Sequence, residues 1–508
     1  MAKIRPRERA AIIQSLRAGV TPRVGLEHIQ VGRVNEVKAM IEELQRVCEG
    51  GSAFKVIVGD FGAGKSFFLQ LVRYLALEQG LVVVNADLSP DRRLHSSSGQ
   101  ARSLYQELMR NMATRAHPEG NAMVPVVERF ITTQMQESEA TGVPVDQVIK
   151  RKLYSLSELV DGFDFAEVIA KYYQGYEEGN DELKNAAIRY LRGEYSSRVE
   201  ARSDLQVRNI VTDSSIYDHL KLLARFVCQA GYKGLIVNLD ELVNLYKLPS
   251  PRARNANYEQ ILRILNDCLQ GSAEHIAFLL GGTNDFLSDT RKGLYSYEAL
   301  RSRLSENTFA KVANVVDYHG PVLKLDNLSP EELYVLLCNI RNVFANGDES
   351  KYLIPDEGLT AFLRHCQMNI GEAYFRTPRN TIKAFVDLLS VLEQNPEISW
   401  QSLVEMVKID SEFDQNNDPP LVTLPQSYSA LPQSPDGALS MPQDNSDSTG
   451  VYAGDILSGV PFGMPVGSPV PPQRKSPAAS AHQAKTATPA SKASLSDDDD
   501  DDLATFKL

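Results

Sequence analysis

One short segment carries residues typical of phosphate binding. Gly59-Asp-Phe-Gly-Ala-Gly-Lys-Ser66 satisfies the pattern G-x-x-x-x-G-K-[ST], with an apolar run before it and a helical pattern after it. In such a P-loop, backbone N–H groups and a helix N-terminus face the phosphates, the lysine reaches the β- and γ-phosphates, and the hydroxyl ligates Mg²⁺. The alternative is a chance glycine turn, which the flanking strand and helix patterns disfavour. We predict an ATP and Mg²⁺ site formed by Gly59, Asp60, Phe61, Gly62, Ala63, Gly64, Lys65, Ser66 and Phe67.

A second segment ends in two carboxylates. Gly234-Leu-Ile-Val-Asn-Leu-Asp-Glu241 reads as a buried strand that delivers Asp240 and Glu241 to the carboxyl edge of a sheet, where ligands bind. We predict that Asp240 holds Mg²⁺ together with Ser66, and that Glu241 polarises the attacking water during hydrolysis of ATP to ADP and phosphate. Two carboxylates can also simply end a strand. Their occurrence after a P-loop favours the catalytic interpretation.

Three further sites offer supporting groups. Asn284 follows another predicted strand and could order the lytic water, with Thr283 as the alternative; equally, Asn284 could only cap a turn. Charge that develops on the γ-phosphoryl oxygens needs a cation, and Arg301, Arg303 and Arg379 are the candidates. Each arginine could instead belong to an ordinary surface ion pair.

These residues need a sheet to bring them together. Five apolar runs alternate with helical segments, which predicts a doubly wound parallel α/β sheet covered by helices on both faces. The predicted strands are Ala53–Val58, Leu81–Ala86, Leu235–Leu239, Ile276–Leu280 and Val322–Leu325.

The segments around the sheet predict the domain organisation. Residues 1–50 form a helical lead-in, with a helix over Pro6–Ala18, and residues 51–328 form the core, with a helical insertion at about 104–209. Ser329 as N-cap and Glu332 three residues later form a capping box that starts a helical lid over 329–413. Residues 414–508 are rich in Pro, Ser, Ala and Asp, which predicts a disordered tail. Its acidic run, Asp497–Asp502, is either a solvating sequence or a docking peptide.

Net charge, cysteine spacing and hydropathy restrict the classes of function that the sequence is compatible with. The net charge of −12 means that any DNA contact needs a local basic patch. The N-terminal residues Lys3, Arg5, Arg7, Arg9, Arg17 and Arg23 could form that patch or be the solvated face of a helix. The five cysteines are scattered, which disfavours a zinc site or a disulfide framework. No membrane span or secretion signal is evident, so we expect a soluble cytoplasmic protein.

Together these motifs resemble the AAA+/STAND class of P-loop ATPases, and the sheet is expected to be AAA+/ASCE-like. The resemblance adds Val31-Gly-Arg33 with Glu36, Leu325-x-x-Leu-Ser-Pro-Glu-Glu332 and Pro378-Arg379 to the motifs above. It implies that Val31, Gly32 and Arg33 line the base pocket and that Arg379 acts on the ATP of its own chain. It also implies that Arg301 or Arg303 faces the nucleotide of a neighbouring subunit in a homo-oligomer.

Two segments are more specific. Ala230-Gly-Tyr-Lys-Gly234 and Arg291-Lys-Gly-Leu-Tyr-Ser-Tyr-Glu-Ala-Leu300 resemble the BREX system ATP-binding family (BrxD-like), over roughly residues 5–410. The resemblance implies an oligomeric ATPase of a bacterial phage-defence system that acts with DNA, or with helicase or DNA-modifying partners. The alternative is a nucleotide-dependent switch or scaffold with slow turnover.

Overall fold

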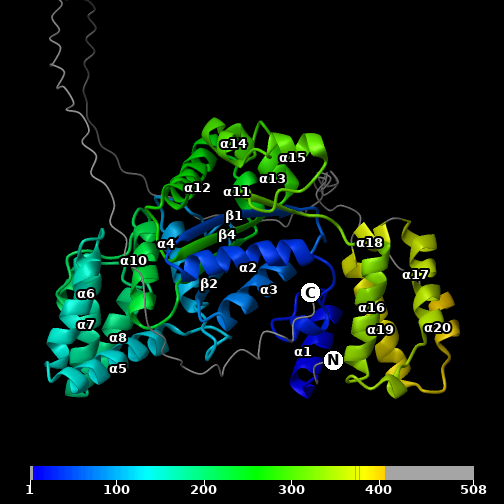
Figure 1. Cartoon of the computed structure of the whole chain (residues 1–508), viewed down its shortest axis with the longest axis horizontal. Helices are drawn as coiled ribbons and strands as arrows, with labels where there is room; N and C mark the ends of the chain where they lie inside the picture. Colours follow the sequence, from blue (N-terminus) through cyan, green and yellow to red (C-terminus); the bar gives the residue numbers. More distant parts are fainter. Residues whose placement is uncertain (1–3, 372, 377, 407–508) are drawn as a thin grey trace, which may run out of the picture. The chain divides into compact units, whose positions relative to one another are not determined.

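A parallel β-sheet lies at the centre of the α/β core (Figure 1). The computed structural model describes residues 4–371, 373–376 and 378–406. Within these residues, five strands are hydrogen-bonded in the order β2-β3-β4-β1-β5, and neighbouring strands are parallel. They are β1 (Ser52–Gly59), β2 (Val82–Asp87), β3 (Leu235–Asp240), β4 (Ile276–Gly282) and β5 (Val322–Leu325). The predicted α/β class and the five predicted strands are confirmed.

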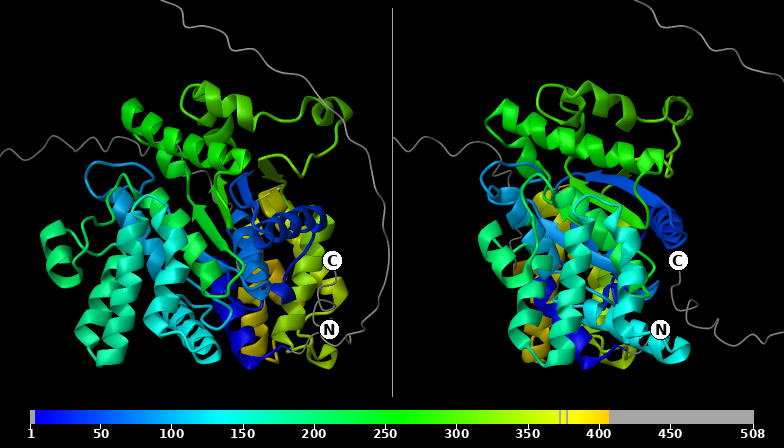
Figure 2. Two further views of the ribbon diagram at one scale, coloured as in Figure 1. Left: turned by 60° about the vertical axis from the view of Figure 1, so that its left-hand side comes forward. Right: turned by 90° about the vertical axis from the view of Figure 1, so that its left-hand side faces the viewer.

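Both faces of the sheet are buried. On β1, Ile57 packs on one face whereas Val56 and Val58 pack on the other. The first face is covered by α2 (Val34–Cys48) and α3 (Lys65–Glu78). The second is covered by α10 (Ile216–Gln229) and α12 (Pro251–Gln270), and Figure 2 shows α12 across the sheet from α2 and α3. Because successive side chains of a strand point to opposite faces, a strand covered on both sides is apolar almost throughout.

Lys55 is the exception on β1. Its side chain is buried and forms an ion pair with Glu43, with 3.0 Å between Nζ and Oε1. Nζ also donates hydrogen bonds to the carbonyl oxygens of Tyr318 (3.0 Å) and Gly320 (2.7 Å). A buried charge is tolerated when it is paired and hydrogen-bonded in this way. Lys55 therefore fixes the turn that precedes β5 to the strand that leads into the P-loop.

A group of helices fills the segment between β2 and β3. Phe226 of α10 contacts Phe130 and Phe165, with ring centroids 5.2 and 5.5 Å apart. Their buried residues belong to the same hydrophobic cluster as one face of the sheet, so these helices and the sheet share a core. The helices before α10 are α4 (Gln100–Arg110), α5 (Met123–Thr141), α6 (Val145–Ser157), α7 (Gly162–Glu178), α8 (Asp181–Leu191) and α9 (Arg198–Leu205).

Short helices follow β3 and β4, and they lie near α12 in the upper part of Figure 1. They are α11 (Val243–Tyr246), α13 (Asn284–Ser288), α14 (Glu298–Leu304) and α15 (Thr308–Ala313). Single 3₁₀ turns occur at Leu26–His28, Leu294–Ser296 and Glu349–Lys351.

The helices after β5, which we call the lid helices after the predicted lid, share a separate hydrophobic cluster with residues of the N-terminal segment. The predicted capping box is confirmed: the Ser329 hydroxyl accepts the Glu332 amide (3.1 Å), and the Ser329 amide donates to the Glu332 carboxylate (2.9 Å). The helices are α16 (Pro330–Phe344), α17 (Asp356–Ile370), α18 (Ala373–Arg376), α19 (Pro378–Gln394) and α20 (Trp400–Met406). The end of the predicted lid, 407–413, and the predicted tail, 414–508, lie outside the described residues.

The N-terminal helix α1 (Pro6–Arg17) packs on α16 and α19. Ile12 is fully buried in the cluster of the lid helices. Arg17 pairs with Asp387 at 3.1 Å, and Arg9 pairs with Glu393 at 2.7 Å. Two of the basic residues considered for a DNA-binding patch therefore contact carboxylates of the lid, and Lys3 lies outside the described residues.

The chain has no helix long and apolar enough to cross a bilayer among the residues that the structure describes. All five cysteines are described, and none forms a disulfide.

Candidate active site

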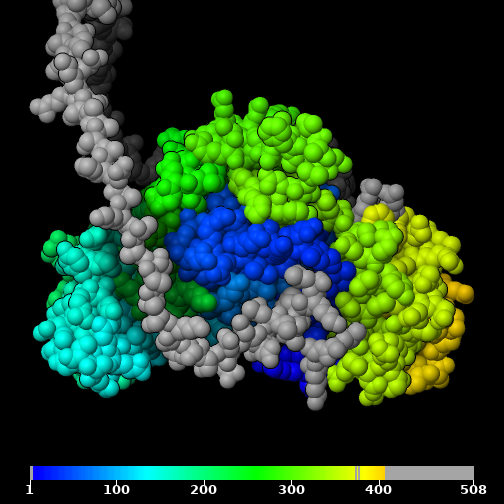
Figure 3. Space-filling view, in the orientation of Figure 1, coloured from blue at the N-terminus to red at the C-terminus, as the bar shows by residue number. Residues whose placement is uncertain are grey.

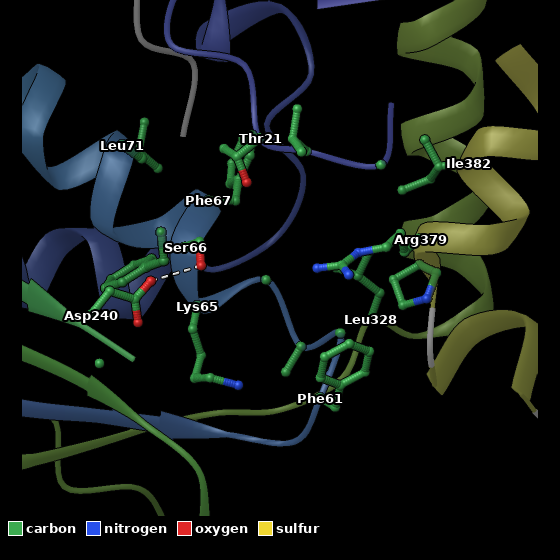
Figure 4. Close-up of a pocket in the computed structure, with 18 of the residues that line it drawn as sticks. Thr21, Phe61, Lys65, Ser66, Phe67, Leu71, Asp240, Leu328, Arg379 and Ile382 are labelled. Carbon is green, nitrogen blue, oxygen red and sulfur yellow. Dashed lines mark hydrogen bonds between the residues drawn. The ribbon is translucent and has the colours of Figure 1, made fainter. Parts of the chain in front are cut away.

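Three neighbouring strands end at one edge of the sheet, and the loops after them form the candidate site. β4 lies between β1 and β3, so the P-loop after β1, the carboxylates after β3 and the loop after β4 come together. Ligands of open parallel sheets bind at this carboxyl edge. A cavity opens here, and its walls come from the P-loop, the connection after α1, the ends of β3 and β4, and α19 (Figure 4).

Two glycines of the P-loop are required by its geometry. A Cβ at Gly59 would lie 2.7 Å from the carbonyl oxygen of Leu325, so β5 can approach β1 only at a glycine. Gly64 has a φ of +83° and is the N-cap of α3, a conformation that other residues rarely adopt. The loop therefore turns sharply and aims the N-terminus of a 14-residue helix at the cavity. Phe67, in the first turn of α3, lines the same cavity.

The Lys65 side chain folds back onto the P-loop residues that precede it. Its Nζ donates to the carbonyl oxygens of Gly59 (2.9 Å) and Asp60 (2.8 Å). Burial lowers the pKa of Lys65, and the negative charges of Asp240 and Glu241 oppose that shift. The ammonium group is thus held at the cavity wall, where it can contact a phosphate.

Ser66 and Asp240 are brought into direct contact, as Figure 4 shows. The Ser66 hydroxyl donates to Oδ2 of Asp240 at 2.8 Å. Room for the carboxylate is created by Gly281, where a Cβ would lie 2.3 Å from Oδ1 of Asp240. A hydroxyl and a carboxylate are hard oxygen ligands of the kind that Mg²⁺ prefers beside phosphates. The two residues therefore fit the metal site expected from the sequence.

Glu241 follows Asp240 in a left-handed conformation with a φ of +58°. Its amide donates to Oδ1 of Asp240 at 2.8 Å, which stabilises this turn. Partial desolvation raises the pKa of the Glu241 carboxyl, and the charges of Asp240 and Asp87 raise it further. A carboxylate with a raised pKa is a better acceptor of a proton from water. The side chain is exposed at the cavity and can contact a water molecule there.

Asp87 is an additional carboxylate at this edge that sequence reasoning missed. It ends β2 and pairs in register with Asp240 on β3. Burial raises the pKa of Asp87, and the adjacent charge of Asp240 raises it further. The signal was present in the sequence, because Asp87 comes directly after an apolar run that was predicted to be a strand.

The two polar residues after β4 have different partners. Asn284 donates from Nδ2 to Oδ1 of Asp60 at 2.6 Å, so it connects this loop to the P-loop. Thr283 lines the cavity, but its hydroxyl accepts the amide of Phe286 and caps α13.

Arg379 reaches the P-loop of its own chain from the lid. It lies in the first turn of α19, and its guanidinium carbon is 5.0 Å from the centroid of the Phe61 ring (Figure 4). Its positive charge also contributes to the lowered pKa of Lys65. The lid and the phosphate loop therefore meet at the cavity.

The residues expected at the base pocket divide into two roles. Val31 and Arg33 line the cavity, whereas Gly32 lies against Glu332, whose carboxylate oxygen would be 2.2 Å from a Cβ at this position. Arg33 donates from Nη2 to the carbonyl oxygens of Ala63, at 2.7 Å, and Asp326. Burial lowers the pKa of Arg33. Its guanidinium therefore joins the P-loop to the connection between β5 and α16.

Most of the apolar wall of the cavity was not predicted. It is formed by side chains from α1, the connection after it, the β5–α16 connection and the lid, namely Leu16, Val20, Ile29, Leu328, Leu336 and Ile382. Each is an ordinary apolar residue in the sequence, so no motif distinguished it from core.

Arg301 and Arg303 lie away from the cavity of their own chain. Both are exposed on α14, and neither belongs to the cavity wall. Arg303 donates from Nη1 to the carbonyl oxygen of Ala299 in the same helix.

Comparison with known proteins supplies the family. The family model described as BREX system ATP-binding protein BrxC/D matches residues 4–408, which include every element that forms the cavity. No curated protein matches the chain. A phosphate loop, an opposed hydroxyl and carboxylate, and a lid that reaches the loop agree with the ATP-binding role that this description prints. The chain belongs to the BREX system ATP-binding protein BrxC/D family.

Proposed function

We propose that the protein is a Mg²⁺-dependent ATPase of a bacterial phage-defence system. The observation that carries the proposal is the contact between Ser66 and Asp240 beside Lys65 and Glu241, at the mouth of the P-loop. These four residues are the minimum needed to hold a nucleoside triphosphate, its metal ion and an attacking water.

Each of these residues has a separate role in the proposed reaction. Lys65 and the amides at the start of α3 bind the β- and γ-phosphates, and Ser66 and Asp240 hold Mg²⁺, which would neutralise charge on the phosphates. Glu241 orients the attacking water and accepts its proton. Arg379 approaches the phosphates from the lid of the same chain, as its contact with Phe61 supports.

The base is proposed to enter the apolar part of the cavity. Val31 and Ile29 form one side, and Ile382 of α19 lies in the wall contributed by the lid. Because this wall comes from both the core and the lid, base binding favours the lid position in which Arg379 lies at the P-loop.

The proposed oligomeric assembly and the proposed partners are based on the resemblance to the AAA+/STAND class. A strand between the P-loop strand and the Asp-Glu strand, and a helical lid with an arginine in its first turn, both support it. We propose a cytoplasmic homo-oligomer in which Arg301 or Arg303 serves the site of a neighbour, acting with DNA or DNA-processing partners of the defence system.

Paired substitutions test the ATPase proposal. Lys65→Ala should abolish tight ATP binding, because it removes the cation at the phosphates. Glu241→Gln should still bind ATP with Mg²⁺ but should not release phosphate, because the amide cannot accept a proton. Nucleotide affinity would be measured with a fluorescent ATP analogue, and turnover by phosphate release with and without DNA.

Equal nucleotide affinity in wild type and Lys65→Ala would refute the P-loop assignment. Normal binding by the wild-type protein without turnover under any condition would support the switch or scaffold alternative instead.

A further inference from the structure

Phe61 is an aromatic side chain on the phosphate loop itself. It occupies one of the positions that the pattern G-x-x-x-x-G-K-[ST] leaves open. The ring is 56% exposed, and it lines the cavity instead of packing into the core. A phenyl ring offers neither a hydrogen-bond donor to a phosphate nor a ligand to Mg²⁺. Its role at this loop must therefore be sought in the side chain that it contacts.

That side chain is Arg379 of the lid helices. Its guanidinium carbon lies 5.0 Å from the centroid of the Phe61 ring, within the range of a cation–π interaction (Figure 4). The aliphatic part of the arginine passes the connection after α1, since a Cβ at Gly19 would lie 3.4 Å from its Cδ. The arginine is thus held between two segments that both line the cavity.

Lys65 is a second cation close to Arg379. Burial lowers the pKa of Lys65, and the charge of Arg379 also lowers it, so the two cations repel each other. Three carboxylates act on Lys65 in the opposite direction, namely Asp240, Glu241 and Asp60. None of the three is within ion-pair distance of Arg379, which forms no ion pair within the part of the chain that the structure describes. The ring of Phe61 is therefore the group that the guanidinium contacts at the P-loop.

The lid helices need such a contact because their core is separate. Their buried side chains form a hydrophobic cluster distinct from the clusters on the two faces of the sheet. Figure 3 shows the yellow-green surface of these helices beside the blue surface of the N-terminal segments. Arg33 binds the connection that enters the lid, at the carbonyl oxygen of Asp326. The contact between Phe61 and Arg379 adds a second fixed point, on the helix that carries the arginine.

We propose that Phe61 is a positioning residue that holds Arg379 beside the phosphate site, so that the arginine is in place when the γ-phosphate of ATP arrives. The inference rests on the proposed ATPase function. An exposed ring face attracts a guanidinium weakly, whereas a phosphate accepts two parallel hydrogen bonds from it. Arg379 can therefore exchange the ring for the γ-phosphate at small cost. A larger fraction of chains with the arginine in place raises the apparent affinity for ATP.

Nucleotides with and without a γ-phosphate test the role of the ring. Phe61→Leu keeps an apolar side chain but removes the ring face. We expect its affinity for a non-hydrolysable ATP analogue to fall by about two- to fivefold, the size of one exposed cation–π contact, and its affinity for ADP to match that of wild type. Phe61→Tyr keeps the ring face and should lose less affinity for the ATP analogue. Equal losses for both nucleotides, or no loss for either, measured by calorimetry, would overturn the proposal.

A double-mutant cycle determines whether Phe61 acts through Arg379. When Arg379→Ala is already present, Phe61→Leu should cause no further loss of affinity for the ATP analogue, because the cation is gone. Lys383→Ala is the matched background, since Lys383 is an exposed cation on the same helix that does not line the cavity. There the loss should remain about two- to fivefold. Equal losses in the two backgrounds would show that Phe61 does not act through Arg379.

Fluorinated phenylalanines at position 61 separate electrostatic attraction from packing. Fluorine withdraws negative charge from the ring face and changes its shape little, so the attraction to a guanidinium weakens with each fluorine added. The affinity for the ATP analogue should fall along the series, and the affinity for ADP should not. A series without this trend would refute the positioning role, because packing alone would then explain the contact.

Binding by the wild-type protein separates this inference from the function on which it rests. Wild type that binds neither the ATP analogue nor ADP would overturn the ATPase proposal. Wild type that binds both, with affinities that Phe61→Leu reproduces, would overturn the role of Phe61 and leave the ATPase proposal intact.

Discussion

Asp240 accepts the Ser66 hydroxyl through one carboxylate oxygen and the Glu241 amide through the other. Both contacts depend on the same side-chain orientation, so the proposed metal ligand, Asp240, and the turn that presents Glu241 are positioned together. The orientation in turn requires a residue without a side chain at Gly281, on the neighbouring strand. At the scale of single residues, the geometry of the site thus depends on the Asp240 carboxylate and on the space that Gly281 leaves beside it.

Gly281→Ala tests this dependence. The added Cβ would lie 2.3 Å from Oδ1, so the Asp240 carboxylate must move away from Ser66. We expect Mg²⁺-dependent phosphate release to fall by about tenfold or more, comparable to the loss of other positioning contacts around a metal. A Mg²⁺ titration of turnover should also shift to higher concentration.

Gly320→Ala is the matched control, because the nearest atom to its Cβ would be 3.7 Å away and its φ is not left-handed. It should hydrolyse ATP like wild type. Unchanged turnover in Gly281→Ala would show that the position of the Asp240 carboxylate does not depend on the absence of a side chain at Gly281.

At the scale of elements, α1 belongs with the lid although it begins the described chain. It packs on α16 and α19, and the residues directly after it, Gly19 to Pro22, line the cavity. The side chain of Arg379 also lies 3.4 Å from where a Cβ at Gly19 would be. The connection after α1 is therefore held between the lid helices and the candidate site.

Reversing the ion pair between α1 and α19 tests this arrangement. Arg17→Glu would face Asp387, and the repulsion should displace the connection that lines the cavity. Exposed pairs contribute up to about 1 kcal/mol, so we expect ATP affinity to weaken by roughly two- to fivefold. The swap, Arg17→Glu with Asp387→Arg, should restore most of the loss in a fluorescent-nucleotide titration. A swap that binds no better than the single variant would contradict the role of the pair.

The sequence predicted the elements better than it predicted the cavity. Strands covered on both faces have continuous apolar runs, and the P-loop and the Asp240-Glu241 pair have their own spacing, so both could be found. Leu16, Leu328 and Ile382 could not, because they come together from distant segments and look like core residues. Arg33 was placed near the site, but its bonds to the carbonyl oxygens of Ala63 and Asp326 depend on tertiary contacts that no pattern encodes.

At the scale of the whole molecule, the groups that we propose to be catalytic lie in two places. Lys65, Ser66, Asp240, Glu241 and Arg379 meet at one cavity, whereas Arg301 and Arg303 are exposed on α14. A complete set of groups would then require two copies of the chain.

Mixing inactive variants tests this division. An arginine supplied in trans accelerates phosphoryl transfer by roughly a thousandfold or more, so Arg301→Ala or Arg303→Ala should abolish turnover while ATP still binds. Combined with Glu241→Gln in mixed oligomers, the arginine variant should regain part of its turnover, because some interfaces pair an intact Glu241 with an intact arginine.

Lys65→Ala mixed with Glu241→Gln is the control, since every site then has a defect of its own. It should stay inactive. If the arginine mixture also stays inactive although mixed oligomers form, the arginines do not act between subunits.

The cavity wall has a consequence for the energetics of folding. Its residues include some from positions 16–22, 61–68 and 378–382, so one bound nucleotide would connect segments more than 300 residues apart. A ligand that binds only the folded chain stabilises it by about 2.7 kcal/mol at a hundred times its dissociation constant. That free energy opposes separation of α1 and the lid from the core. The resistance of these segments to proteolysis should therefore rise and fall with the nucleotide concentration around the protein.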